Sequence, residues 1–533
     1  MDARVLIIGA GLAGMVAARA ARRAGAGVLL VDRGVPGTGA NSILANGNFA
    51  ITSASRPAVD YIRDVIEIGK GINRLSYVKQ VAGGTSGIVS FLRDLGLDLV
   101  ELPGSCFIRA SSPEIIPGVT LVRKLAGELR STGGIGILTG FHVTELLRDG
   151  GRVHGVRGFD KKGRERTLSA PAVVLACGGA GAVYARNDNA RTILGQGYHL
   201  AAEAGLELRD MEFVQCYPIV IAEPGLPSMM IYPPYPDEGK LLNAAGEDVV
   251  EKHGLGNINA AIMTKRDTFS ALLMEEERKG PVVMDLRKVP ESAWQRHPLS
   301  LLARLHIDAR RKPVRVAPAV YFCVGGVAID GEGRTDLQGL YACGEVVWGL
   351  HGANRMGGNA LTECVVSGTM AGCGAARLAR SAPSAVTGRS ETGAAAVSGS
   401  KGREADFRQL RRAITQVARD SAGVVRSRDG IREGLMKIEG IEKELGESAA
   451  ENPAERIARE DLMSAAFVVR AILEASLGRE ESRGTFMRSD FPLQDDINWL
   501  KNSVCTRDHE ARGGVRVRFQ DVGRRVTSRQ ETA

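Results

Sequence analysis

The sequence predicts an α/β protein built on a dinucleotide-binding unit of the Rossmann type and followed by a helical region. Three patterns indicate this class. Residues 4–34 give a strand, a glycine turn, a helix and a second strand that ends in an acid. The order of strand, glycine turn and helix occurs again at 339–368. Helical periodicity runs from 403 to about 477. Because 533 residues exceed one compact core, we expect two to four domains.

Composition and charge exclude several classes of partner. The net charge is +8, but the basic residues are scattered and aromatic residues make up only 5%, so we expect no nucleic acid partner. The 8 cysteines include no CxxC pair and no zinc-like spacing, so we expect neither a metal site nor an iron–sulfur cluster in this chain. No basic leader and no apolar run of membrane-spanning length is present, which favours a cytoplasmic protein with no direct membrane span.

The first glycine turn has the spacing of a dinucleotide fingerprint. RVLII reads as a short buried strand, and GAGLAG follows it. Gly9 permits a tight turn, Gly11 lets a pyrophosphate approach the backbone, and Gly14 lets the helix pack closely. The helix N-terminus supplies N–H donors, and Asp32 at the end of VLLVD is placed to accept a hydrogen bond from a ribose hydroxyl. This motif alone does not separate NAD from FAD.

A second glycine-rich stretch, GLYACGEVVWGLHGANRMGGNALTEC from residue 339, favours FAD. Its strand, turn and helix supply further N–H donors, here for the pyrimidine edge of a flavin, and Glu345 is placed to hold a ribitol or ribose hydroxyl. The alternative is a glycine-rich packing corner. Just before it, VAPAVYFCVGGVAID returns the chain to the nucleotide-binding unit. We expect Gly325 and Gly326 to pass close to the flavin, with a β-bulge as the alternative.

Five segments together resemble the fumarate reductase/succinate dehydrogenase flavoprotein family, which includes L-aspartate oxidase. They are GAGLAG, GGAGAVY, DMEFVQCYP, the stretch from 339 to 364, and ESRGTFMRSDFPLQDDINWL. The resemblance implies a two-segment FAD-binding Rossmann-like domain at 1–215 and 316–380, with an inserted α+β capping domain at 216–315. Residues 381–402, rich in Ala, Ser and Gly, read as a linker or insertion before a C-terminal helical domain and tail at 403–533.

The resemblance also implies the chemistry. Members exchange a hydride between a flavin and a substrate carbon, with a paired proton transfer. The motif match places Arg266, beside Asp267, at the proton-transferring position, and Arg355 at the position that binds a substrate carboxylate. A guanidinium binds a carboxylate through two hydrogen bonds and stays charged, so it needs a relay and a dry site to act as an acid. The alternative for Arg266 is a surface arginine on a helix.

Three polar substrate positions of the family differ in this chain. The family's substrate histidines fall on Tyr217 and Tyr321, and its threonine–glutamate pair falls near Ile231 and Tyr232. Tyrosine donates a hydrogen bond, but it is bulkier than histidine and uncharged at neutral pH. We therefore expect a carboxylate substrate other than succinate, fumarate or aspartate, such as a larger or more apolar acid or a thioester. His351 joins the three tyrosines in the predicted substrate-binding set.

We expect non-covalent FAD. Family members in membrane complexes attach FAD through a histidine, and the matching position is Asn41. The predicted cofactor-binding residues are Gly9, Gly11, Leu12, Ala13, Gly14, Asp32, Arg33, Asn41, Ser42, Ala45, Asn46, Gly47, Gly178, Gly179, Gly325, Gly326, Gly344, Glu345, Asn359, Ala360 and Leu361.

More than one function stays open. The first is a cytoplasmic FAD oxidoreductase that acts on a small carboxylate substrate across a C–C or C–N bond. The second is a flavoprotein electron-transfer subunit that docks an iron–sulfur partner, through which it would be peripheral on the inner membrane. The third is an L-aspartate oxidase-like activity, and the fourth is a nucleotide-binding protein without redox activity.

Overall fold

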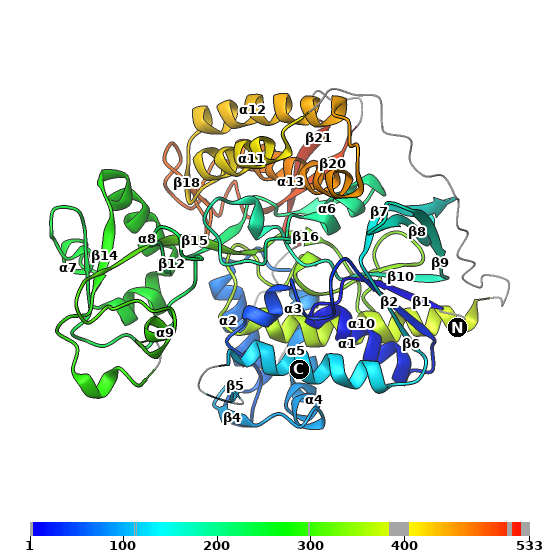
Figure 1. Ribbon diagram of the computed structural model, residues 1–533, viewed down its shortest axis with the longest axis horizontal. Helices are drawn as coiled ribbons and strands as arrows, with labels where there is room; N and C mark the ends of the chain where they lie inside the picture. Colours follow the sequence, from blue (N-terminus) through cyan, green and yellow to red (C-terminus); the bar gives the residue numbers. More distant parts are fainter. Residues whose placement is uncertain are drawn as a thin grey trace.

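The computed structural model describes residues 4–110, 112, 115–296, 299–382, 405–508 and 514–523. Residues 383–402 of the expected linker lie outside the described residues. The chain forms a nucleotide-binding region, a cap to one side of it and a layer of three helices above it (Figure 1). This arrangement confirms the predicted α/β class with an inserted cap and a helical C-terminal region.

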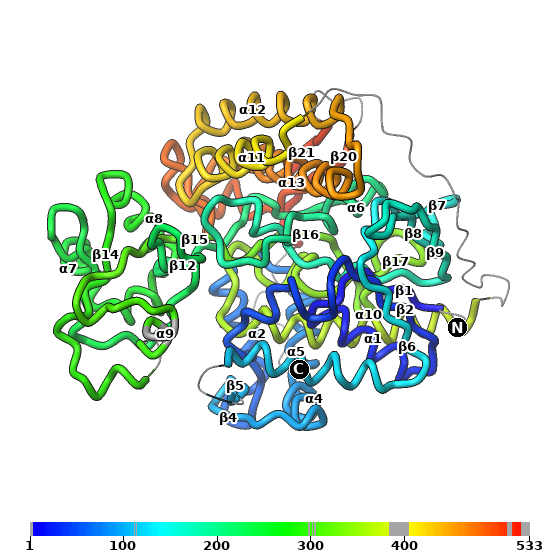
Figure 2. Tube along the Cα trace, in the orientation of Figure 1, coloured from blue at the N-terminus to red at the C-terminus, as the bar shows by residue number. Residues whose placement is uncertain are grey.

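A five-stranded sheet forms the centre of the nucleotide-binding region, in the order β17-β10-β1-β2-β6. All its pairings are parallel, and β1 is buried throughout, as apolar strands covered on both faces require. Strand β17, from the second glycine-rich stretch, pairs with β10, which in turn pairs with β1, so the two glycine-rich stretches contribute to one sheet (β1, β2 and β17 in Figure 2). The strands are β17 (Leu340–Ala342), β10 (Ala172–Leu175), β1 (Val5–Ile8), β2 (Val28–Asp32) and β6 (Ile135–Thr139).

Two long helices on this sheet come from the two halves of the nucleotide-binding region. Helix α1 (Leu12–Arg23) packs against α10 (Asn359–Ser381). A Cβ at Gly368 would lie 2.7 Å from the Ala13 carbonyl oxygen, and one at Gly372 would lie 2.3 Å from that of Ala17. Glycine at both positions therefore lets the two helices approach closely, so the N-terminal and later segments form one unit.

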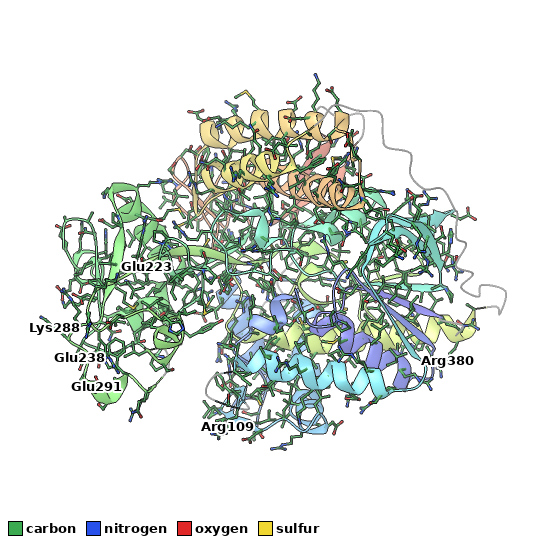
Figure 3. All side chains as sticks on the ribbon, viewed as in Figure 1. Arg109, Glu223, Glu238, Lys288, Glu291 and Arg380 are labelled. Atoms are coloured by element: carbon green, nitrogen blue, oxygen red, sulfur yellow. The ribbon has the colours of Figure 1, made fainter. Side chains whose placement is uncertain are left out.

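The cap carries its own sheet, in the order β12-β15-β14-β13, and its own hydrophobic core, which extends from Tyr217 to Ala319. Charged side chains such as Lys288 and Glu291 lie on its outer edge (Figure 3). The expected boundaries at 216 and 315 fall within β12 and β15, so these two strands connect the cap to the rest of the molecule. Its elements are β12 (Val214–Ile221), β13 (Lys240–Leu242), α7 (Val249–Lys252), α8 (Ile258–Lys279), β14 (Val282–Asp285), α9 (Leu299–Arg304) and β15 (Val314–Cys323).

The C-terminal region begins with α11 (Phe407–Ser421), α12 (Arg428–Glu447) and α13 (Pro453–Gly478). After these helices the sequence predicted only a tail, but the structure contains a hairpin of β20 (Lys501–Arg507) and β21 (Val515–Asp521). β20 pairs with β11 (Leu208–Arg209), which also pairs with β16 (Gly326–Val327). The alternation of apolar and basic residues in VRVRFQD was the available strand signal.

The other elements surround these three regions. Among the residues that the structure describes, no helix has both the length and the apolar character needed to cross a membrane. The remaining helices and strands are β3 (Asn48–Ala50), α2 (Ala58–Ile68), α3 (Leu75–Gly84), α4 (Ile88–Asp94), β4 (Leu99–Leu102), β5 (Ser105–Ile108), α5 (Pro117–Ser131), β7 (Phe141–Asp149), β8 (Arg152–Asp160), β9 (Glu165–Ser169), α6 (Gln196–Glu203), β18 (Val425–Arg426) and β19 (Met487–Arg488).

Candidate active site

A cavity of about 1570 Å³ lies where the nucleotide-binding region, the cap and the segment from 482 to 494 meet. The glycine turn after β1 and the start of α10 line one part of it, and Arg266, Arg355 and the three tyrosines line another. The sequence therefore predicted both groups of residues, and the structure places them in the same cavity.

The N-termini of α1 and α10 both open into this cavity. Their N-cap residues, Gly11 and Gly358, have no side chain that could bond the first N–H groups, although at α1 the Leu12 N–H donates to Ser42 Oγ. Helix N-termini offer N–H donors and a partial positive charge to an anion such as a pyrophosphate. A Cβ at Gly357, beside the second start, would meet no protein atom within 4 Å. These features fit a bound dinucleotide.

The three glycines of the first turn have the different structural roles that the motif predicts. Gly9 has φ +105°, and a Cβ there would lie 2.3 Å from the Ala176 carbonyl oxygen. A Cβ at Gly14 would lie 1.9 Å from the Gly9 carbonyl oxygen, so Gly14 serves helix packing and does not line the cavity. Gly11 does line it.

Two partly buried carboxyl groups, those of Asp32 and Glu345, flank the dinucleotide part of the cavity. Asp32 accepts hydrogen bonds from the backbone N–H groups of Ala10, at 2.7 Å, and Gly34, at 2.6 Å, and so holds the glycine turn. Burial raises the pKa of Asp32. Glu345 accepts a hydrogen bond from the Cys323 N–H at 3.0 Å, and burial raises its pKa to about 7. Both lie where a ligand hydroxyl can reach them.

Asn41 and Ser42 begin a short 3₁₀ helix, Asn41–Leu44, on the cavity wall. Ser42 Oγ accepts a hydrogen bond from the Leu12 N–H at 3.1 Å. The Asn41 amide donates to Asn189 Oδ1 and accepts from the Ala190 N–H, at 2.5 and 3.0 Å. Asn41 therefore also fixes the loop at 187–190, which the sequence did not reveal.

Several predicted cofactor residues lie behind the cavity wall. Gly325 and Gly326 do not line the cavity, and a Cβ on them would lie 2.4 Å from the Arg209 carbonyl oxygen and 2.2 Å from that of Val346. The expectation that they pass close to the flavin is therefore corrected, because they pack against backbone at β11 and at the turn 344–346. Of the other predicted residues, those absent from the wall are Gly14, Gly47, Gly179 and Asn359, and those on it are Gly9, Gly11, Leu12, Ala13, Asp32, Arg33, Asn41, Ser42, Ala45, Asn46, Gly178, Gly344, Glu345, Ala360 and Leu361.

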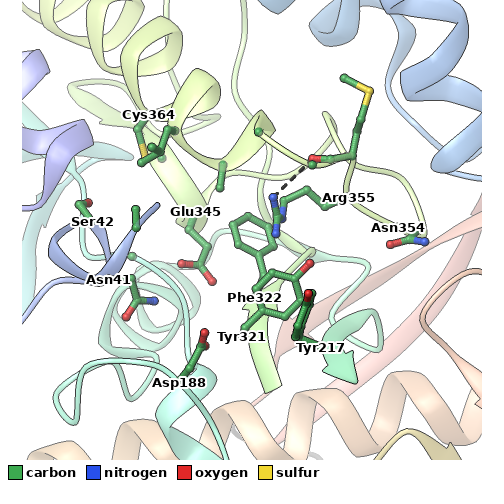
Figure 4. Close-up of a pocket in the computed structure, with 18 of the residues that line it drawn as sticks. Asn41, Ser42, Asp188, Tyr217, Tyr321, Phe322, Glu345, Asn354, Arg355 and Cys364 are labelled. Atoms are coloured by element: carbon green, nitrogen blue, oxygen red, sulfur yellow. Dashed lines mark hydrogen bonds between the residues drawn. The ribbon is translucent and has the colours of Figure 1, made fainter. Parts of the chain in front are cut away.

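Arg355 is a cation without a carboxylate partner in the part of the chain that the structure describes. Its guanidinium lies 5.0 Å from the ring centroid of Tyr321 and 4.5 Å from that of Phe322. Nη1 donates to the Met356 carbonyl oxygen at 3.4 Å, the dashed line in Figure 4, and the buried Nε has no hydrogen-bond partner. A cation held by aromatic rings with free donors suits an anionic ligand.

Arg266 reaches the same place from the cap. Helix α8 is kinked at Lys265, which has the non-helical φ of −136° and ψ of 29°. Arg266 Nη2 donates to Asn354 Oδ1 at 2.9 Å and to the Arg355 carbonyl oxygen at 3.1 Å. Its Nε lies 3.9 Å from Asp267 Oδ1, and Asn354 donates to the other Asp267 oxygen. Asn354 thus joins the cap arginine and its aspartate to the nucleotide-binding region, a role that sequence reasoning missed.

The three tyrosines form an aromatic wall beside the arginines. The Tyr217 ring centroid lies 6.0 Å from that of Tyr321 and 6.3 Å from that of Tyr232. The Tyr217 hydroxyl lies 3.2 Å from the Tyr235 hydroxyl and 3.3 Å from the Ile231 carbonyl oxygen, so its hydrogen bonds go to the cap. Burial raises the pKa of Tyr217 and Tyr232, which keeps these hydroxyls neutral.

The structure does not place His351 in the cavity wall. Its Nε2 pairs with Glu363 Oε2 at 2.9 Å, and its ring packs edge-on against Phe322 at 5.1 Å. We therefore correct its place in the predicted substrate-binding set, since a buried pairing with Glu363 accounts for this histidine. Asp188, which was not predicted, does line the cavity. Its only sequence signal is its position soon after GGAGAVY.

Comparison with known proteins identifies the family of the chain. The model of the FAD binding domain family matches residues 4–361, and that of the fumarate reductase flavoprotein C-terminal family matches 411–531. The L-aspartate oxidase of Agrobacterium fabrum is 32% identical over 95% of each chain. A fumarate reductase flavoprotein subunit of Mycobacterium tuberculosis is 31% identical over 71% of each chain.

Solved structures show the same fold. The E. coli quinol fumarate reductase flavoprotein superposes with a TM-score of 0.86 at 24% identity, covering 98% of this chain and 97% of that one. The cavity, the two helix N-termini that open into it and these matches together account for FAD as the cofactor. The chain therefore belongs to the fumarate reductase/succinate dehydrogenase flavoprotein family of FAD-dependent oxidoreductases, which includes the L-aspartate oxidases.

Proposed function

We propose that this FAD-dependent oxidoreductase acts on a carboxylate-bearing substrate other than a C4 dicarboxylate. The observation that carries the proposal is Arg355, a buried cation that the described residues leave without a carboxylate partner, beside a wall of three tyrosines. When bound, FAD supplies the acceptor or donor of a hydride. The residues of the chain bind the acid, exclude water and move the proton.

Arg355 binds the substrate carboxylate through its free guanidinium donors. One substrate carbon gains or loses a hydride, which carries two electrons. Arg266 exchanges a proton with the carbon next to it. Asp267 takes or returns that proton, and Asn354 holds both groups in position. Burial raises the pKa of Asp267, while Arg266 acts in the opposite direction.

The tyrosines argue against a C4 dicarboxylate. Such a substrate needs polar donors at both ends, because a buried carboxylate without partners is costly. In the aromatic wall, the Tyr217 hydroxyl is already engaged by Tyr235 and Ile231. The Arg266 Nη2 donor is likewise engaged by Asn354 and the backbone. Aromatic rings there favour an apolar or planar substrate body.

A second candidate function is an electron-transfer subunit for an iron–sulfur partner. Leu493 and Ile497, in the segment that leads away from the cavity, are 78% and 93% exposed, and such apolar side chains suit a protein interface. This function is compatible with oxidation or reduction of an acid, because an iron–sulfur partner would only serve as the electron acceptor or donor for the flavin.

The roles of the arginines are tested on photoreduced protein under anaerobic conditions. We expect an unsaturated monocarboxylate to reoxidise the flavin, and Arg266→Gln to slow this by about 10²–10⁴-fold, the usual contribution of a general acid. Arg287→Gln, on the exposed cap surface, is the matched control. Reoxidation by artificial acceptors but by no acid would favour the electron-transfer subunit, as would co-purification of an iron–sulfur protein. An unaltered rate in Arg266→Gln would refute the proton-transfer role.

A further inference from the structure

Asp188 stands in a loop that the protein holds rigidly against β15. Its backbone N–H donates to the Val320 carbonyl oxygen at 3.2 Å. The neighbouring Asn189 donates to the same oxygen at 3.3 Å, and Asn187 donates to the Tyr184 carbonyl oxygen at 2.7 Å. With Asn41 holding Asn189 from the other side, the position of Asp188 is fixed. These hydrogen bonds therefore fix the position of Asp188 on the cavity wall.

The Asp188 carboxyl has no hydrogen-bond donor from any other residue that the structure describes. Arg355 and Tyr232 interact electrostatically with Asp188, and Glu345 and Tyr321 line the same cavity. Figure 4 shows the carboxyl on the side of the cavity where Glu345 lies, across the aromatic side chains from Arg355. Nothing in this set neutralises Asp188 by direct pairing, so the group acts on whatever occupies the cavity.

We propose that Asp188 is a charge filter that restricts the substrate to acids with a single carboxylate. This inference rests on the proposed function, because it assumes that Arg355 binds the carboxylate of the substrate. The second carboxylate of a C4 dicarboxylate would extend from Arg355 into a space bordered by Asp188 and by uncharged tyrosines. An aryl or other apolar body meets no such repulsion there, and it packs against Tyr232 and Tyr321.

A count of charges at this end of the cavity supports the filter. Arg266 is balanced by its neighbour Asp267, at 3.9 Å. Arg355 then acts on both Asp188 and Glu345, so a substrate with two carboxylates would place two further anions beside a single cation, whereas a substrate with one carboxylate adds only one. Arg186, on the same loop as Asp188, does not change the count, because both of its terminal nitrogens bind Glu277 at 2.7 Å.

The filter should depend on pH. Burial raises the pKa of Asp188 to about 7, with Arg355 acting in the opposite direction. The group is thus neutral below this value and anionic above it, so discrimination against a second carboxylate grows as the pH rises. Glu345 titrates in the same range, with a pKa of about 7. A variant of Asp188 is therefore needed to separate the two carboxyl groups.

The test is a binding titration on the oxidised, FAD-loaded protein, read from the flavin absorption spectrum, which needs no turnover. The probes are succinate and 3-phenylpropanoate, applied to the wild type, Asp188→Asn and the exposed control Asp308→Asn. At about pH 8 we expect Asp188→Asn to tighten succinate binding by up to roughly tenfold, the cost of protonating Asp188 at that pH, and 3-phenylpropanoate binding by much less. At about pH 6, where Asp188 is protonated, the gain should largely disappear. Asp308→Asn should match the wild type.

The outcomes separate this inference from the function on which it rests. If both acids bind and Asp188→Asn changes their affinities equally or not at all, the filter is refuted and the carboxylate-binding function stands. If neither acid perturbs the flavin spectrum of any variant, the proposed function fails and the filter fails with it. Flavin content and the circular dichroism spectrum of Asp188→Asn check that the loop is intact.

Discussion

Replacing Arg355 by lysine tests how much the two parallel hydrogen bonds of the planar guanidinium contribute to binding of the carboxylate. The positive charge stays, and the second parallel donor is lost. The guanidinium has free donors and lies 5.0 and 4.5 Å from the Tyr321 and Phe322 ring centroids. The aromatic contact is present with and without the acid, so its loss largely cancels from the binding free energy. The loss of one charge-assisted hydrogen bond remains, about 1.5–3 kcal/mol, or roughly 10–150-fold in Kd.

The assay is a titration of 3-phenylpropanoate against the oxidised flavin spectrum of the wild type and Arg355→Lys. Arg287→Lys, on the outer cap surface where Asp285 already pairs with it, is the matched control and should bind like the wild type. The FAD content of each preparation shows whether the dinucleotide part of the cavity is intact. A Kd for Arg355→Lys within about threefold of the wild type would refute the bidentate binding of the carboxylate. Such a change in binding free energy is smaller than the loss of one charge-assisted hydrogen bond.

Three further predictions concern the cofactor and stability. Because Asn41 occupies the position where a histidine would be the attachment point, acid precipitation should release all FAD into the supernatant, and FAD retained in the pellet would contradict this. Gly14→Ala places a Cβ 1.9 Å from a carbonyl oxygen of the turn, so the protein should lose FAD and melt earlier; Gly127→Ala, with nothing within 4 Å, should do neither. Arg479→Ala removes the ion-pair partner of the buried Glu212 and one of the two arginines that pair with the buried Glu481, and it should cost about 3–5 kcal/mol in urea unfolding, whereas a loss below about 1 kcal/mol would be inconsistent with a buried ion-pair network.

The sequence predicted the parts of the fold that depend on local patterns. The apolar strand before GAGLAG and the helix after it are specified by neighbouring residues, and the structure confirms them. The hairpin at 501–521 was missed because short, charged strands carry a weak signal and gain stability only by pairing with β11, far away in the chain. Strand pairing across such distances cannot be inferred from either segment alone.

The candidate site was predictable to the extent that motifs carry it. The two arginines and the three tyrosines, predicted one by one, line one cavity. Local sequence could not show that Gly325 packs against backbone, or that His351 pairs with Glu363, because both depend on tertiary contacts. Asp188 was missed for the same reason, since nothing nearby in the sequence marks its carboxyl group as facing Arg355.

The central claim is that this family member uses its two arginines on an acid with one carboxylate and an apolar body. The most direct measurement is the anaerobic reoxidation of photoreduced protein by cinnamate and by fumarate at equal concentration, followed at the flavin absorption band. The tyrosine wall and Asp188 predict that cinnamate reoxidises the flavin faster than fumarate does. Faster reoxidation by fumarate would contradict this claim.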